Sequence, residues 1–195
     1  MKITFDWDEV DSLITILHTK GISYLIGDGS ASREDTGNSD PVHLLHRLAA
    51  CGYPLVENAS ISLFILHSDL ASSVVKALQS SEPDIAENIV VVTLATLYLQ
   101  QWWLFRLTFA LGRLSCFPEA PFVPLWEERH LPSPFSGYGL HGLLALQEHQ
   151  RQRYEVHLNF LDDWQNQINH LLAQEEAYRR ELPSGLREAL VQLSV

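Results

Sequence analysis

The sequence predicts an all-α fold, and three observations support this prediction. Apolar residues recur at helical spacing in several segments, of which residues 10–17 are the first. Candidate helix caps precede such segments, as Asp40 does before Pro41. The one strand expected is short and lies at residues 22–26 (ISYLI), which are β-branched and aromatic in composition. We expect one domain, residues 1–195, with about seven helices and one short strand near 22–26.

The first forty residues predict a helix followed by a loop. Asp6 or Asp8 can cap the helix at its start, and Gly21 can end it. Residues 27–40 (GDGSASREDTGNSD) contain three glycines, four acidic residues and no large apolar residue. Such a segment has little to bury, so it predicts a mobile loop.

Several shorter helices are expected on either side of a long one. The first runs from Asp40–Pro41 to Cys51, where Gly52 can end it. The others are expected at residues 58–67, at 69–80, from Leu140 onward, around the apolar series Leu161, Trp164, Ile168 and Leu171, and after residues 183–185.

The longest predicted helix covers residues 83–112, between Pro83 and Gly112. It contains the most apolar stretch of the chain, residues 90–111 (VVVTLATLYLQQWWLFRLTFAL). That stretch has the length of a membrane span. However, its polar residues share less than half of the helix circumference, and amphipathic helices flank it. We therefore expect a central helix of a soluble protein; the polar residues are Thr93, Thr96, Gln100, Gln101 and Thr108.

Arg106 is predicted to be a buried, paired charge. On a continuous helix it lies opposite the polar stripe, on a face that is otherwise apolar. An unpaired buried charge is strongly destabilising, so a carboxylate or carbonyl partner is required. Glu119, Glu127 and Glu128 are the candidates.

Residues 115–139 contain five prolines, which exclude a long helix. The segment is rich in aromatic residues, whereas a flexible linker is polar. We therefore expect an ordered, extended strap that lies across the helices.

Aromatic residues in and near this strap form the candidate partner-binding surface. Trp102 and Trp103 point about 100° apart on a helix, so one core face cannot accommodate both. Aromatic residues and arginine are common at binding hot spots. The alternative is that they anchor the strap to the core. The candidates are Trp102, Trp103, Phe122, Trp126, Phe135 and Tyr138.

Composition narrows the range of functions. The formal net charge is −11, with 13 basic and 24 acidic residues, which argues against direct binding of nucleic acid. Two cysteines fit a reducing compartment, and the first ten residues lack the apolar core of a signal peptide. No catalytic constellation, metal set or cofactor motif stands out. We expect no membrane contact and a cytoplasmic location.

The function that fits best is a non-catalytic helical interaction or assembly module that binds another protein or itself. One alternative is a metal-dependent helical enzyme that uses His43 and His46, which share a helix face at i, i+3 spacing. Another is an accessory factor of a nucleic-acid system, which would act through a basic protein partner.

Overall fold

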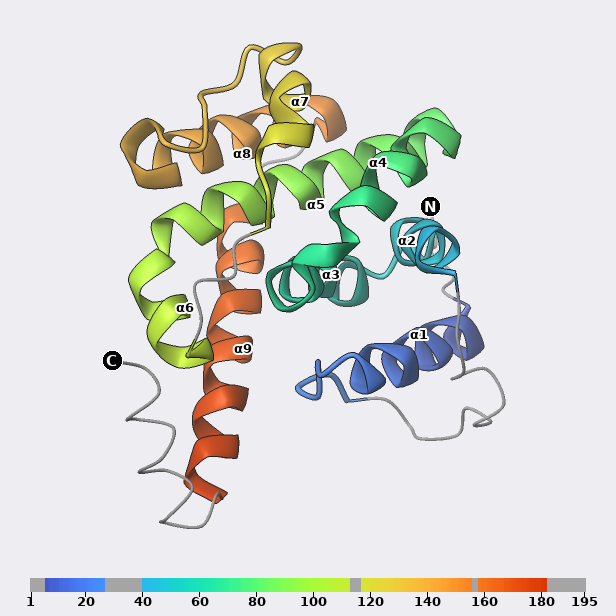
Figure 1. Ribbon diagram of the computed structural model, residues 1–195. Helices are drawn as coiled ribbons and strands as arrows, with labels where there is room; N and C mark the ends of the chain where they lie inside the picture. Colours follow the sequence, from blue (N-terminus) through green and yellow to red (C-terminus); the bar gives the residue numbers. More distant parts are fainter. Residues whose placement is uncertain (1–5, 27–39, 113–116, 156–157, 182–195) are drawn as a thin grey trace.

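The computed structural model describes residues 6–26, 40–112, 117–155 and 158–181, and these residues are all-α (Figure 1). The prediction of an all-α fold is therefore confirmed. The described residues form nine α-helices and three short 3₁₀ helices, named η. In order these are α1 (Trp7–Thr19), α2 (Pro41–Ala50), α3 (Pro54–Leu66), η2 (Ser68–Leu70), α4 (Ala71–Ser80), α5 (Pro83–Trp102), α6 (Leu104–Leu111), η3 (Ala120–Phe122), α7 (Val123–Glu127), η4 (Ser136–Gly139), α8 (Leu140–Tyr154) and α9 (Phe160–Glu181).

Local capping explains where several helices begin. The Asp6 carboxylate accepts a hydrogen bond from the backbone N–H of Glu9 at the start of α1. Asp40 does the same for Val42 at the start of α2. Prolines begin α2, α3 and α5, where the helix does not need their missing N–H group. The predicted mobile loop, residues 27–40, lies outside the described residues except for Asp40.

Residues 22–26 form no strand, so that prediction is wrong. The backbone here is irregular, although two of its apolar side chains are buried in the core. The side-chain amide of Gln174 in α9 accepts a hydrogen bond from Ser23 N–H and donates one to Gly21 C=O, both at 2.7 Å. A glutamine side chain thus supplies the hydrogen bonds that a neighbouring strand would otherwise provide.

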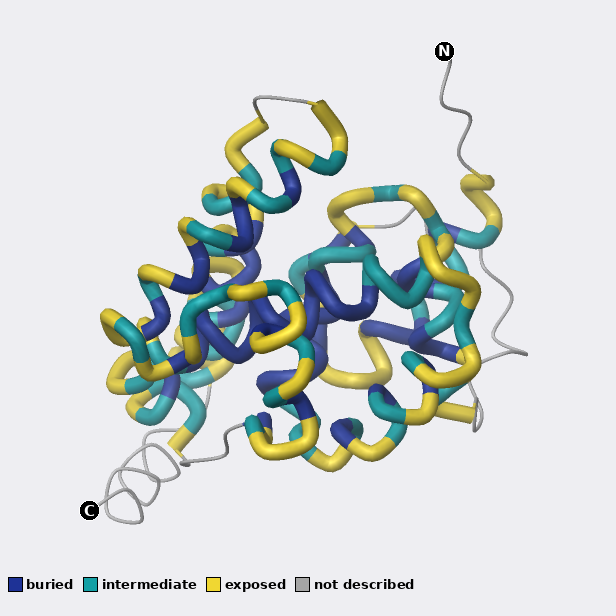
Figure 2. The backbone as a smooth tube through the Cα atoms, turned by 90° about the horizontal axis from the view of Figure 1, so that it is seen from above, coloured by how far each residue is buried: buried dark blue, intermediate teal, exposed yellow. Residues whose placement is uncertain are grey.

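Helix α5 is buried continuously from Ile89 to Gln100. Helices α3 and α4 pack on one side of it and α8 on the other (Figure 1). Figure 2 shows the same burial from above, with buried backbone in the interior and exposed backbone around it.

The predicted helix 83–112 is two helices in the structure. Trp103 leaves the helical conformation (φ −103°, ψ 13°), and α6 is bent by 86° from α5. In this orientation α6 packs against α9, where the Arg179 guanidinium donates to the carbonyl oxygens of Phe109 and Ala110. Contacts with a distant helix thus override the continuity that local sequence favours.

By length and composition, no single helix in the described ranges could cross a membrane. Two bent helix pairs reach the required length and apolarity together. They are Pro54–Leu66 with Ser68–Ser80, bent by 105°, and α5 with α6.

The polar stripe of α5 is internally satisfied. The hydroxyl groups of Thr93 and Thr96 each donate to the carbonyl four residues earlier. Gln100 accepts a hydrogen bond from Phe117 N–H at 2.9 Å and donates one to Phe117 C=O at 2.8 Å. The buried glutamine therefore fixes the point at which the chain returns across α5.

Residues 117–139 are compact, so the prediction of an extended strap is wrong for this segment. It folds into η3, α7 and η4. Pro121 and Pro124 lie in the first turns of η3 and α7, which tolerate proline. The rings of Phe64, Phe117 and Phe122 stack in series, with centroids 5.0 and 5.2 Å apart. The aromatic residues of this segment are therefore partly core anchors.

Candidate functional site

Helix α6 presents two aromatic side chains to solvent. Phe105 is 88% exposed and Phe109 is 80% exposed, and they lie one turn apart on the same helix face. Trp102, at the end of α5, is 36% exposed and lies just before the bend. We call Trp102, Phe105, Arg106 and Phe109 the α6 aromatic surface. The sequence indicates its tryptophan as a candidate but neither phenylalanine, because a continuous helix would place the phenylalanines differently.

Arg106 is exposed, which corrects the prediction of a buried, paired charge. Its guanidinium lies over the ring of Trp103, 4.5 Å from the ring centroid. The prediction failed because the bend at Trp103 turns the next helix outward. An arginine stacked on an indole is a partly ordered cation that can still pair with a partner's carboxylate.

Trp103 forms the base of this surface. Its ring meets that of Trp102 edge to face, with centroids 6.1 Å apart. Its Nε1 atom is buried and has no hydrogen-bond partner among the described residues. Of the two adjacent tryptophans, Trp102 is therefore the more exposed, and Trp103 packs beneath Arg106.

The other predicted surface residues divide into two groups. Phe122 and Trp126 are buried in the core and offer nothing to a partner in this structure. Phe135 and Tyr138 are exposed, at 68% and 80%. They lie at η4, which packs against α5 near Tyr98, one helical turn before Trp102. Two exposed aromatic groups therefore flank the same end of α5.

The histidines do not converge on a metal site. His43 is exposed, while His46 Nε2 lies 3.3 Å from both the Ala77 carbonyl and the Ser80 hydroxyl. Within the described ranges, no group of three or more histidine, cysteine, aspartate or glutamate residues is placed to hold a metal ion. The structure thus adds no support for a site built on His43 and His46.

Cys51 has the environment of an inert thiol. Burial raises its pKa to about 11, and the charges of Glu57 and Glu9 act in the same direction. A thiol with so high a pKa is a poor nucleophile near neutral pH. Cys116 lies outside the described residues.

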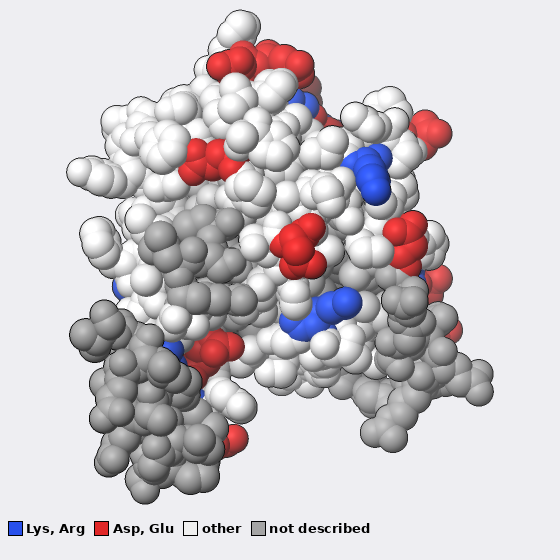
Figure 3. Space-filling view, viewed as in Figure 1, with Lys and Arg blue, Asp and Glu red and all other residues white. Residues whose placement is uncertain are grey.

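An ion network joins α5, the turn that follows α7, and α8. Glu87 accepts a hydrogen bond from Arg129 at 2.5 Å, and His149 and Arg153 lie within 3.4 and 4.0 Å of it. Burial alone would raise the pKa of Glu87, but its hydrogen bonds and the neighbouring arginines hold it below its usual value. Figure 3 shows charged groups scattered over one face of the described surface, without a broad basic patch. We interpret the network as a structural link between helices.

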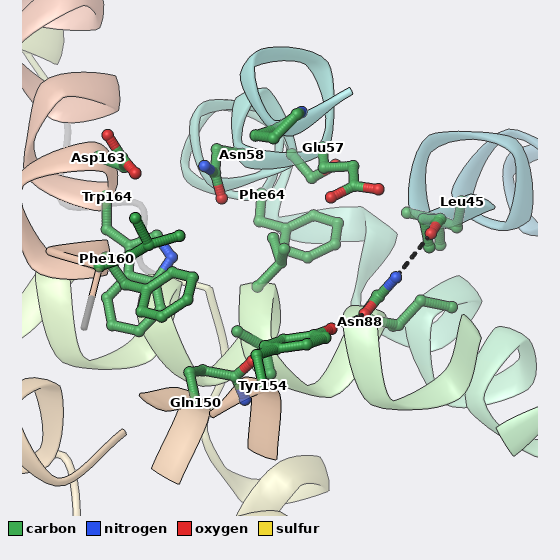
Figure 4. Close-up of a pocket in the computed structure, with 17 residues that line it drawn as sticks. Leu45, Glu57, Asn58, Phe64, Asn88, Gln150, Tyr154, Phe160, Asp163 and Trp164 are labelled. Atoms are coloured by element: carbon green, nitrogen blue, oxygen red, sulfur yellow. Dashed lines mark hydrogen bonds between the residues drawn. The ribbon is translucent and has the colours of Figure 1, made fainter. Parts of the chain in front are cut away.

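A cavity of about 240 Å³ lies among α2, α3, α5, α8 and the start of α9 (Figure 4). Its walls are mostly apolar and include the aromatic rings of Phe64, Phe160 and Trp164. Glu57 and Gln150 line it as well. The sequence does not indicate this cavity, because the lining comes from five separate segments with no shared motif.

Comparison with known proteins identifies no relative. No protein-family model matches the chain, and neither a curated protein nor a solved structure matches it.

Proposed function

We propose that this chain is a non-catalytic, cytoplasmic helical interaction module that binds another protein through the α6 aromatic surface. The observation that carries this proposal is the exposure of Phe105 and Phe109 on one face of a helix. Large aromatic side chains grouped at the surface are typical of binding sites. The two cysteines and the acidic composition are compatible with the cytoplasmic location that we propose.

A different protein is a better partner than a second copy. The chain carries a net charge of −11, so two copies repel each other at long range. A two-fold contact through α6 would also bring Arg106 close to its counterpart, because the same patch meets itself. A partner with an apolar groove and a carboxylate at its rim would fit Phe105, Phe109 and Arg106.

The scaffold lowers the cost of binding. Helix α6 is already folded, packed on α9 and held by Arg179 at its last carbonyl groups. The partner therefore does not have to order the helix, and more of the contact energy remains as affinity. Phe135 and Tyr138 at η4 would extend the contact beyond α6.

Site-specific photocrosslinking tests this proposal. A benzophenone amino acid replaces Phe105 in the full chain, and the same residue replaces the exposed Trp7 of α1 as a control. We expect position 105, and not position 7, to crosslink one defined protein. That protein, once purified, should bind the wild type and not Phe105→Ser/Phe109→Ser.

The same experiment distinguishes two other occupants of the α6 aromatic surface. A crosslink from position 105 to a second copy would replace the proposed partner with self-association. A crosslink confined to residues 182–195 of the same chain would show that the surface is covered internally. Either result would overturn the proposal.

A further inference from the structure

The cavity of Figure 4 is separate from the α6 aromatic surface and has a chemistry of its own. Its volume, about 240 Å³, is below the range of roughly 300–1,000 Å³ usual for drug-sized ligands. A ligand of this cavity must therefore be small. Exposed lining residues, among them Tyr154 and Leu158, form its opening.

The formal charge in the lining is entirely negative. Glu57 and Asp163 contribute carboxylates, and the described lining contains no lysine, arginine or histidine. Figure 4 shows the two carboxylates at opposite ends of one side of the cavity, with Asn58 between them. The faces of aromatic rings and carboxylates together favour a cationic ligand.

Glu57 lacks a countercharge. One of its oxygens accepts a hydrogen bond from Gly52 N–H at 2.9 Å, and no cation forms an ion pair with it among the described residues. Burial, opposed only in part by the Gly52 hydrogen bond, raises the pKa of Glu57 to about 7. Burial and the neighbouring charge of Asp162 also raise the pKa of Asp163. A cation bound at Glu57 would supply the countercharge that this carboxylate lacks.

Gln150 provides an independent sign of a missing ligand. Its side chain lies across the cavity from Glu57 (Figure 4) and is only 3% exposed. Its Nε2 atom is buried and has no hydrogen-bond partner in the described part of the chain. Such groups are rare in folded proteins, because leaving a buried donor unpaired is destabilising. A ligand oxygen could accept this hydrogen bond.

The side-chain amide of Asn88, which also lines the cavity, is already hydrogen-bonded within the protein. Its amide group donates to the Ala49 carbonyl at 3.0 Å, and its oxygen accepts from the Tyr154 hydroxyl at 3.4 Å. Asn88 therefore fixes the wall and the orientation of Tyr154. The Nε2 atom of Gln150 therefore remains available to donate a hydrogen bond to a ligand.

We propose that this cavity binds a small amine that carries an oxygen acceptor at its far end. The protonated amine lies at Glu57, its apolar body packs among Phe64, Phe160 and Trp164, and its oxygen accepts a hydrogen bond from Gln150. This site does not depend on the α6 aromatic surface, so each proposal can fail without the other.

Calorimetric titration of the full chain tests the site with three amine probes: tyramine, 4-aminobutanol and 5-aminopentanol. The uncharged 4-ethylphenol and the anionic 4-hydroxyphenylacetate serve as controls. We expect saturable binding of at least one amine, and binding of the two controls at least about tenfold weaker. Failure of all three amines to bind, or equal binding of the uncharged control, would overturn the proposal.

Variants then locate the bound amine. Glu57→Gln keeps an oxygen for the Gly52 N–H and should weaken binding at least about tenfold. Asp163→Asn, at the more exposed carboxylate, should weaken it less. Gln150→Leu should weaken tyramine binding and leave the binding of phenethylamine, which lacks the oxygen, unchanged. Glu82→Gln, outside the cavity, should have no effect. Full affinity in Glu57→Gln would place the ligand elsewhere and contradict the proposal.

Discussion

Gly142 of α8 lies against the ring of Tyr98 in α5 so closely that a Cβ atom at position 142 would come within 2.1 Å of Tyr98 Cε1. The Tyr98 hydroxyl donates to the Pro132 carbonyl at 2.8 Å, which holds the ring from its other end. Gly139 similarly leaves room for the Tyr98 carbonyl oxygen. This contact sets how α8 crosses α5, and it thereby positions Gln150 in the cavity and η4 beside Tyr98.

Gly142→Ala should therefore destabilise the protein. In an unconstrained helix this change is stabilising by about 1 kcal/mol. Here the added methyl group overlaps a held ring, so we expect a loss of about 1–3 kcal/mol in the free energy of unfolding. Urea denaturation measures it. In a Tyr98→Leu background the loss should shrink, and a stabilising effect in the wild type would contradict the close packing.

Gln100→Leu should lower the free energy of unfolding by about 2–4 kcal/mol, because it leaves the buried N–H and C=O of Phe117 without partners. The adjacent Gln101 provides a matched control. Its Nε2 donates to Glu119 at 2.7 Å in a partly exposed position, so Gln101→Ala should cost less than about 1 kcal/mol. Equal losses for the two variants in urea denaturation would show that Gln100 does not hold the returning chain.

Truncation of the buried and of the exposed aromatic residues in 117–139 should change stability by different amounts. Trp126→Ala removes a buried ring and should cost about 3–5 kcal/mol. Phe135→Ala removes an exposed ring and should change stability by less than about 0.5 kcal/mol. Thermal melts followed by circular dichroism measure both. A large loss for Phe135→Ala would mean that this ring also anchors the segment.

Glu57 should make the protein less stable as the pH rises. The folded carboxyl, with a pKa near 7, keeps its proton to a higher pH than the unfolded one, whose pKa is near 4.5. The destabilisation is therefore absent below about pH 4.5, grows as the pH rises and is complete above about pH 7. Glu57→Gln should be as stable as the wild type at pH 4 and more stable at pH 8, by up to about 3 kcal/mol. A stability difference that does not vary with pH would contradict a half-buried carboxyl that lacks a countercharge.

The all-α fold could be predicted because it depends on local signals. Helical spacing of apolar residues and caps such as Asp40 act within a few residues of each other. The bend at Trp103 could not be predicted in this way, since it depends on packing between α6 and a helix about seventy residues later, where Arg179 binds Phe109. For the same reason, the sequence did not predict that Arg106 is exposed.

The candidate sites show the same limit. The sequence suggested an aromatic surface near Trp102, but it could not separate exposed rings from buried ones such as Phe122. The polar groups of the cavity, Glu57 and Gln150, are far apart in the chain and belong to no motif. Only the packing of five segments brings them to one space.

The central claim is that Phe105 and Phe109 form the contact with another protein. The most direct test is the affinity of the purified crosslinked partner for three full-length chains, measured by calorimetry. We expect Phe105→Ser/Phe109→Ser to weaken binding by about a hundredfold or more, as expected for two central aromatic anchors. Trp7→Ala, an exposed aromatic of α1, should bind like the wild type. Unchanged affinity in the double variant, with its circular dichroism spectrum intact, would contradict the proposed interface.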